Sequence, residues 1–315
     1  AFAGPFIVSG SVICDNRYRP WPPNSLKSAP IMQKLFNPQK LENYLTEGSR
    51  HVEGYLLSGS ASVICSILDI QDELKITGNI AEIGVFHGKL LILLAHSLRQ
   101  GESVFAIDVF DSQPDIQGIK TAEDQRMFSP DNLINNLQAN DIDVALVKLV
   151  IANSQDLGEQ DIKEEFEDSE IRLFSVDGDH SRAGVRHDLN LAATVLSAGG
   201  IILADDLFNT ICPSLTEGII DFFRDDNDGR LAPVAIIAAN GPVHTGSTKL
   251  VLADAAYADL YKAYLQLLNR TNYSHTDEFL GASHVLIFDF KEQPARHPLD
   301  DDVRRAVAEF TSGQA

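Results

Sequence analysis

From Gly78 onward, short runs of β-branched and apolar residues alternate with longer stretches whose apolar positions recur every three or four residues. The first pattern is typical of strands and the second of amphipathic helices, so their alternation indicates βαβ units and a parallel sheet. The expected strands span residues 80–85, 104–109, 145–151, 171–177, 200–205, 234–238, 249–253 and 285–290. The expected helices span residues 87–98, 130–140, 161–166, 183–196, 214–223 and 255–268. The chain is therefore predicted to be an α/β protein with a doubly wound sheet.

The segments on either side of this alternation have other patterns. Residues 1–38 are rich in Pro, Asn and Ser, and because prolines forbid regular helix, we expect an extended arm there. Two helical patterns between residues 38 and 75, around Leu41 and around Val63, predict an N-terminal helical cap. We therefore divide the chain into an arm and cap at 1–75, an α/β domain at 76–290 and a C-terminal tail at 291–315.

Composition narrows the class of protein. The 315 residues are 44% hydrophobic and 22% charged, which is close to the globular average and excludes a disordered or collagen-like chain. The formal net charge of −20 repels phosphate backbones and anionic lipids, so we expect neither a nucleic-acid nor a membrane partner. An extended N-terminal arm is compatible with a homo-oligomer.

The cysteines indicate the compartment. Cys14, Cys65 and Cys212 are odd in number and show no C-x-x-C spacing, so neither a disulfide framework nor a zinc site is encoded. A reducing cytoplasm is the simplest location.

Glycines and an acidic residue follow the first two predicted strands. Gly84 and Gly88 form a turn that lets a ligand approach the backbone, beside Glu82, and the following helix N-terminus favours a carboxylate. Asp108, at the end of the second strand, is placed to bind two ribose hydroxyls. A tight turn and a capping role are the alternatives. Ser154, after the third strand, is predicted either to contact an adenine or to belong to a capped helix start.

Aspartates gather at the ends of the fourth and fifth predicted strands. Asp177 and His180 follow one strand, and Asp205 and Asp206 follow the next. Neighbouring strands lie about 4.8 Å apart, so these carboxylates would repel one another unless a cation joins them. Hard oxygen ligands favour Mg²⁺, Mn²⁺ or Ca²⁺ over zinc, and His180 is placed to accept a proton. The alternative is that these residues cap helices, as Asp179 is expected to do for the helix that begins near Arg182.

Four motifs together resemble the class I S-adenosylmethionine (SAM)-dependent methyltransferases, most closely the metal-dependent O-methyltransferases of the macrocin type. These are Glu-Ile-Gly-Val-Phe-His-Gly at 82–88, Ala-Ile-Asp at 106–108, Val-Asp-Gly-Asp-His at 176–180 and Leu-Ala-Asp-Asp at 203–206. The resemblance covers about residues 50–255. It implies a Rossmann-like, mostly parallel seven-stranded sheet whose last strand is reversed, and methyl transfer from SAM to a hydroxyl of a small molecule such as a sugar, polyketide or phenol.

The resemblance also implies a role for each matching residue. His180 would be the catalytic base. Lys89 departs from the family pattern, which commonly has Ser or Thr near the cofactor carboxylate. The implied cofactor-binding residues are Glu82, Gly84, Gly88, Asp108, Ser154 and Asp177, and the implied metal ligands for Mg²⁺ or Mn²⁺ are Asp177, Asp205 and Asp206.

Three other functions are considered. A nicotinamide-dependent oxidoreductase could use the same sheet, but Glu82 stands where the first glycine of G-x-G-x-x-G would be. A non-catalytic cofactor-binding protein is the second alternative, and the retained acidic residues and His180 argue against it. Nucleic-acid methylation is opposed by the net charge and by the absence of an Asn-Pro-Pro-Tyr type of motif after the fourth strand.

Overall fold

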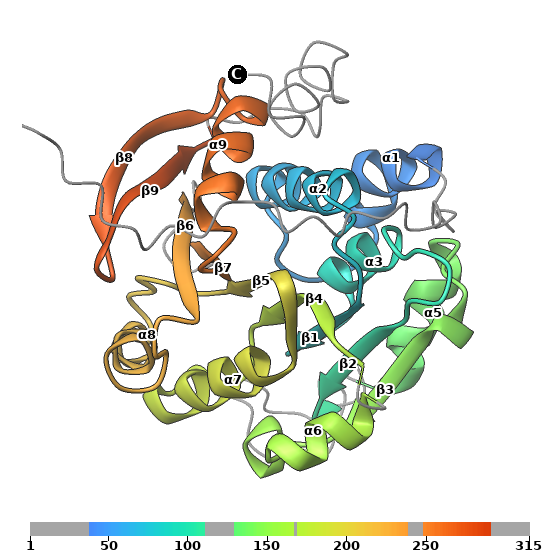
Figure 1. Ribbon diagram of the computed structural model, residues 1–315. Coiled ribbons are helices and arrows are strands. Elements are labelled where there is room, and N and C mark those ends of the chain that lie inside the picture. The colour runs from blue at the N-terminus through green and yellow to red at the C-terminus, as the bar shows by residue number, and fades with distance from the viewer. Residues whose placement is uncertain (1–37, 111–128, 167–168, 239–247, 291–315) are drawn as a thin grey trace, which may run out of the picture. The chain divides into compact units, whose positions relative to one another are not determined.

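The computed structural model describes residues 38–110, 129–166, 169–238 and 248–290 (Figure 1). The predicted N-terminal arm, the hairpin expected at residues 240–242 and the tail after Lys291 lie outside the described residues. No helix in these four ranges is both long and apolar enough to cross a bilayer.

Within the described residues, nine strands form one sheet in the order β3-β2-β1-β4-β5-β7-β6-β9-β8. The first five run parallel, whereas β7 is antiparallel to both β5 and β6. The bounds are β1 Asn79–Ile83, β2 Val104–Asp108, β3 Val147–Ile151, β4 Ile171–Val176, β5 Leu196–Ala204, β6 Leu231–Ala238, β7 Lys249–Asp254, β8 Tyr273–Phe279 and β9 Ala282–Asp289. The predicted doubly wound α/β fold with a reversed strand is confirmed.

Helices cover both faces of this sheet (Figure 1). The helices α1, α2, α3, α5 and α9 contribute to the core on one face, and α6, α7 and α8 to the core on the other. Their bounds are α1 Pro38–Thr46, α2 Ser58–Glu73, α3 Lys89–Ala95, α5 Pro130–Ala139, α6 Glu159–Glu165, α7 Arg182–Val195, α8 Pro213–Asp225 and α9 Ala258–Leu268.

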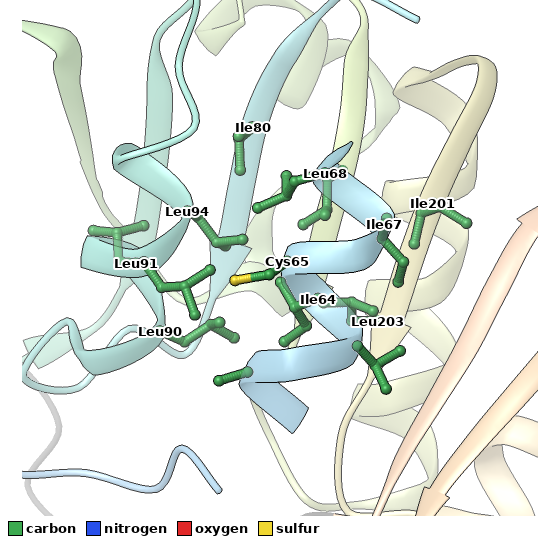
Figure 2. Packing of buried hydrophobic residues seen from close by; sticks show 14 of the residues in the cluster. Ile64, Cys65, Ile67, Leu68, Ile80, Leu90, Leu91, Leu94, Ile201 and Leu203 are labelled. Carbon is green, nitrogen blue, oxygen red and sulfur yellow. The ribbon is translucent and has the colours of Figure 1, made fainter. Parts of the chain in front are cut away.

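The strands supply both cores because successive side chains point to opposite faces. Along β5, Ile201 and Leu203 belong to the core with α2, whereas Ile202 belongs to the core with α7. Figure 2 shows how α2 fills the first core: Ile64 and Ile67 lie among side chains of β1, α3 and β5. The helices predicted as a cap thus share the core of the sheet, and the domain boundary at residue 75 stays a prediction.

Two sequence expectations about the sheet are wrong. The sheet has nine strands within the described residues rather than seven, because the pair β8 and β9 extends it past β6. No strand was expected at β8, because its sequence is polar and lacks a run of apolar residues; in the structure none of its side chains is buried. Residues 145 and 146, expected to begin a strand, lie in the 3-10 helix Val144–Leu146.

The order of the strands in the sheet indicates where a ligand is expected to bind. The chain proceeds from β1 outward through β2 and β3, and then returns to the other side of β1 for β4 and β5. Ligands of open α/β sheets bind at the carboxyl ends of the strands, where the order reverses in this way. This switch lies between β1 and β4, whose ends carry Glu82 and Asp177.

Candidate active site

The turn between β1 and α3 brings the backbone against the end of β4. Gly84 has a φ of +82° and Gly88 a φ of +84°, in the left-handed region that side chains disfavour. A Cβ at Gly84 would lie 1.7 Å from the carbonyl oxygen of Asp177, and one at Gly88 would lie 2.4 Å from Leu133. Packing alone therefore requires both glycines, so their predicted contact with a cofactor stays a prediction.

Glu82 is buried in β1 just before this turn. It is 3% exposed, and its Oε2 has no hydrogen-bond partner among the described residues. Burial and the nearby charge of Asp177 raise the pKa of Glu82 well above its usual value, although Lys249 opposes them. A buried polar atom without a partner is costly, and a ligand that donates a hydrogen bond would remove that cost.

Asp108 at the end of β2 is oriented by two backbone groups. Its Oδ2 accepts a hydrogen bond from the N–H of Phe86 at 2.9 Å, and its Oδ1 accepts one from the N–H of Phe110 at 2.9 Å. Each carboxylate oxygen has more than one lone pair, so Asp108 can still accept two hydroxyl donors. The carboxylate is thus held ready for the predicted ribose contact.

Ser154 lies at the start of a capped helix, as the capping alternative predicts. The Asn153 side chain accepts a hydrogen bond from the N–H of Gln155, at the start of the 3-10 helix Ser154–Asp156. The Ser154 side chain is buried, and its hydroxyl opposes the rise that burial causes in the pKa of Asp188 on α7. Contact between Ser154 and an adenine stays a prediction.

The expected capping role of Asp179 is wrong. Ser181 caps α7, because its side chain accepts a hydrogen bond from the N–H of Gly184. Asp179 instead accepts a hydrogen bond from the Ser181 hydroxyl at 2.5 Å and supports the cap indirectly.

Three of the predicted site residues meet at the ends of β4 and β5. Nε2 of His180 lies 3.5 Å from Oδ1 of Asp177 and 3.2 Å from Oδ2 of Asp206. The side chain of His180 is 49% exposed, whereas that of Asp206 is 10% exposed. The imidazole is therefore accessible, and it lies close to a partly exposed carboxylate, Asp177, and to a more buried one, Asp206.

The same proximity changes the pKa values of this cluster. The hydrogen bond that the His180 ring donates to Asp177, reinforced by the charge of Asp206 and opposed by burial, raises the pKa of His180 to about 9. Loss of water around the carboxyl and the charge of Asp205 raise the pKa of Asp177 to about 7. Perturbed pKa values of this kind concentrate at functional sites.

Asp205 lies beside this cluster but has different partners. Its Oδ2 accepts a hydrogen bond from Nζ of Lys249 on β7, and its Oδ1 accepts one from the N–H of Asp206. Asp205 is 4% exposed and Lys249 is 1% exposed, so the ion pair is buried. Burial alone would lower the pKa of Lys249, but the carboxylates of Asp205 and Asp177 raise it above its usual value.

Sequence reasoning missed Lys249 and the loop after Asp206. A lysine that heads an otherwise apolar strand was the available signal for Lys249. In the loop, the sulfur of Cys212 lies within 4.8 Å of a ring nitrogen of His180 and a carboxylate oxygen of Asp206. Phe208 and Ile211 of the same loop are 55% and 65% exposed, so apolar surface adjoins the cluster.

Lys89, the departure from the family pattern, is turned toward the backbone. Its Nζ donates a hydrogen bond to the carbonyl oxygen of Gly54 at 3.2 Å, and its own carbonyl accepts one from the Tyr44 hydroxyl. Burial lowers the pKa of Lys89. In the structure, the ammonium joins α3 to the segment that precedes α2.

A family model covers the part of the chain that contains this cluster. Residues 81–207, less than half of the chain, match a family model described as "Methyltransferase domain". The matched range begins in β1 and ends directly after Asp206, so it contains the switch point and the carboxylate cluster. No curated protein matches the sequence.

Several solved structures are similar in fold. A putative O-methyltransferase from Klebsiella pneumoniae is 18% identical, with 70% of this chain and 91% of that chain covered and a TM-score of 0.47. The O-methyltransferase TomG from Streptomyces achromogenes, solved with SAM, is 15% identical, with 69% and 90% covered and a TM-score of 0.47. The O-methyltransferase NovP is 16% identical, with 62% and 80% covered and a TM-score of 0.45.

These likenesses are too distant to identify a substrate or a metal requirement. The family match nevertheless supports the prediction of a methyltransferase, and the sheet order agrees with the predicted fold.

Proposed function

We propose that the protein transfers a methyl group from SAM to a hydroxyl oxygen of a small molecule, with the help of a divalent cation. The observation that carries this proposal is the convergence of Asp177, His180 and Asp206 at the ends of β4 and β5. This cluster offers both a proton acceptor and carboxylate ligands beside the switch point of the sheet, where a ligand is expected.

The donor would lie along the ends of β1 and β2. Asp108 would accept hydrogen bonds from two ribose hydroxyls, and the unpartnered oxygen of Glu82 would accept one from an amino group of the methionine part. Gly84 and Gly88 would allow the methionine part to approach the backbone between them. When bound, SAM supplies an electrophilic methyl carbon, which passes to the acceptor oxygen as its bond to sulfur breaks and S-adenosylhomocysteine (SAH) is left.

The residues of the cluster fit a divalent cation. Ligand atoms of His180, Asp206 and Cys212 lie within 4.8 Å of one another. Carboxylate oxygens of Asp177 and Asp206 lie 3.5 and 3.2 Å from Nε2 of the same ring. Mg²⁺ is typically held by one or two carboxylates together with water and substrate oxygens, and these two would hold it. When bound, the cation supplies positive charge that stabilises the deprotonated acceptor and offsets the carboxylates that keep the proton on His180.

His180 would move the proton. Its half-exposed ring is placed for Nε2 to accept the hydroxyl proton of the acceptor, and a positioned base of this kind contributes roughly 10²–10⁴-fold. The remaining acceleration comes from alignment of the acceptor oxygen with the methyl carbon. Phe208 and Ile211 would contribute an apolar surface against which the acceptor packs.

Calorimetry and a methyl-transfer assay test the proposal together. The protein should bind SAH but not NADH, and a panel of catechols, phenols and sugars should include a methylated acceptor. The variant His180→Ala should lower turnover by about 10²–10⁴-fold while SAH affinity stays unchanged, because the ring acts on the acceptor.

The exposed His51 offers a matched control, since His51→Ala should leave both readouts unchanged. Absence of SAH binding would refute the methyltransferase proposal. Unchanged turnover in His180→Ala would remove His180 from the mechanism, and full activity in EDTA would remove the cation.

A further inference from the structure

Lys249 and Asp205 face each other across two neighbouring strands. In the antiparallel pairing of β5 with β7, Ala204 lies opposite Leu250, so the next positions along bring Asp205 opposite Lys249. Their side chains form an ion pair in which both are almost completely buried. Because the strand pairing fixes both backbones, this contact is built into the sheet.

Both oxygens of Asp205 have partners inside the protein, and the side chain is almost completely buried against a cation. Lys249 occupies one carboxylate oxygen, and the N–H of Asp206 occupies the other. In contrast, Asp177 and Asp206 turn carboxylate oxygens toward the exposed ring of His180. We call Asp205, which is paired with Lys249, the inner layer of acidic residues. Asp177 and Asp206, which lie beside His180, form the outer layer.

Lys249 also acts on one other buried carboxyl group, Glu82, and on Asp177 of the outer layer. Its charge opposes the rise in the pKa of Glu82 and of Asp177. A fixed positive charge among several carboxylates reduces the attraction that they exert on any further cation.

We propose that Lys249 is a built-in cation that keeps Asp205 out of the metal coordination, so that a divalent ion at this site is held by Asp177 and Asp206. This inference rests on the proposed function, since it concerns the cation that the transfer reaction uses. It replaces the three-carboxylate ligand set that the sequence resemblance implies with a set of two. It also makes Lys249 a positioning residue that sets how tightly the site binds metal.

Binding of Mn²⁺, followed by the loss of its free-ion EPR signal, tests this assignment without any turnover. The double variant Asp205→Asn with Lys249→Met removes the ion pair as a neutral unit, so it should fold and bind Mn²⁺ within about threefold of the wild type. The variant Asp206→Asn removes a ligand and should weaken Mn²⁺ binding by roughly tenfold or more.

Lys249 can also be changed alone. Lys249→Met removes a positive charge and frees Asp205, so Mn²⁺ should bind roughly tenfold more tightly. Lys249→Arg keeps the charge and should restore the wild-type affinity, which a purely structural role of the ion pair would not require. The double variant keeps the proposal testable even where Lys249→Met fails to fold.

Two results would overturn the inference. One is a double variant that loses Mn²⁺ as strongly as Asp206→Asn does, since Asp205 would then be a ligand. The other is a wild-type protein whose Mn²⁺ affinity is the same as that of Asp206→Asn. Calorimetry with SAH on the same samples separates this failure from a failure of the methyltransferase proposal, because Mn²⁺ binding and SAH binding are read independently.

Discussion

Clusters of buried charged side chains lie at both ends of the central strands. The two clusters differ in whether each acidic group has a cationic or hydrogen-bonding partner. At the amino end of β4, Arg172 is fully buried and donates hydrogen bonds to Glu102, Gln71 and Ser97. Arg99 lies 3.8 Å from the same Glu102, and its guanidinium also donates to a backbone carbonyl. Arg99 also lies 3.5 Å from Asp72, so two arginines face two acidic groups here.

At the carboxyl ends, acidic groups are in excess. Four carboxyl groups face one lysine and one histidine, and Glu82 keeps an oxygen without a partner among the described residues. The four carboxyl groups are those of Glu82, Asp177, Asp205 and Asp206, and the two basic residues are His180 and Lys249. At the amino end of the strands the buried polar groups are thus paired, whereas at the carboxyl end some hydrogen-bond acceptors have no donor among the described residues.

The difference separates a structural cluster from a ligand site. A buried network whose donors and acceptors are all matched makes one core geometry stable. A network that lacks donors gains them only when a cation or a hydrogen-bonding ligand binds. Substitutions at the amino end should therefore cost stability, and those at the carboxyl end should cost ligand binding.

The largest expected effect is the loss of stability in Arg172→Met. This change leaves the buried Glu102 without its main cation, so the free energy of unfolding should fall by about 3–5 kcal/mol. Urea denaturation followed by circular dichroism measures it. Arg224→Met on α8 removes an exposed arginine from its ion pairs and should cost only a small fraction of that loss. Equal losses in the two variants would contradict the structural role of the amino-end cluster.

A second prediction concerns Asp188, a buried acid on α7 close to the carboxyl end. Its Oδ2 has no partner among the described residues and would lie 2.6 Å from a Cβ at Gly178. Burial raises the pKa of Asp188 from 3.8 to about 6. Because the folded pKa lies above the unfolded one, the contribution of this group to stability is complete below pH 3.8 and is lost as the pH rises through about 6.

Asp188→Asn should remove this loss. Between pH 4.5 and 7.5 the wild type should lose roughly 2 kcal/mol of unfolding free energy more than the variant does, as measured by denaturation at each pH. Asp131→Asn, an exposed substitution in the first turn of α5, should follow the wild-type curve. A pH dependence that is identical in wild type and Asp188→Asn would show that Asp188 ionises in the fold at no cost.

Features that depend on the local pattern of apolar and polar residues could be predicted from the sequence. Asp177, Asp205 and Asp206 directly follow runs of apolar residues, so their place at strand ends could be inferred from the strands alone. Ser181 was missed as the cap of α7, because Asp179 offers the same capping chemistry two residues earlier.

The partners that come from distant elements could not be predicted in this way. Lys249 meets Asp205 only because β7 inserts antiparallel beside β5, a pairing that no local pattern encodes. Arg172 is equally hidden, since it lies inside an apolar strand and its partners come from α2 and from the segment before β2. The strand β8 was missed because edge strands that are exposed on both faces lack the alternation of apolar and polar residues.

The smallest expected change in stability is that of Glu82→Gln. Because the Oε2 of Glu82 has no partner, the substitution loses no hydrogen bond there, and the free energy of unfolding should change by less than about 1 kcal/mol. SAH affinity should nevertheless fall about tenfold, since a bond from the charged amino group of the ligand to the side chain is weakened. Denaturation and calorimetry on the same protein measure both quantities.

The same substitution at the other end of the sheet is the matched control. Glu102→Gln removes the negative charge that Arg172 and Arg99 share, so it should cost about 3 kcal/mol of stability and leave SAH affinity unchanged. Glu82 and Glu102 are each 3% exposed, so a difference between the two variants reports their partners and not their depth in the protein. A Glu82→Gln variant that loses as much stability as Glu102→Gln and still binds SAH with wild-type affinity would contradict this assignment. Glu82 would then stabilise the fold and would not bind the ligand.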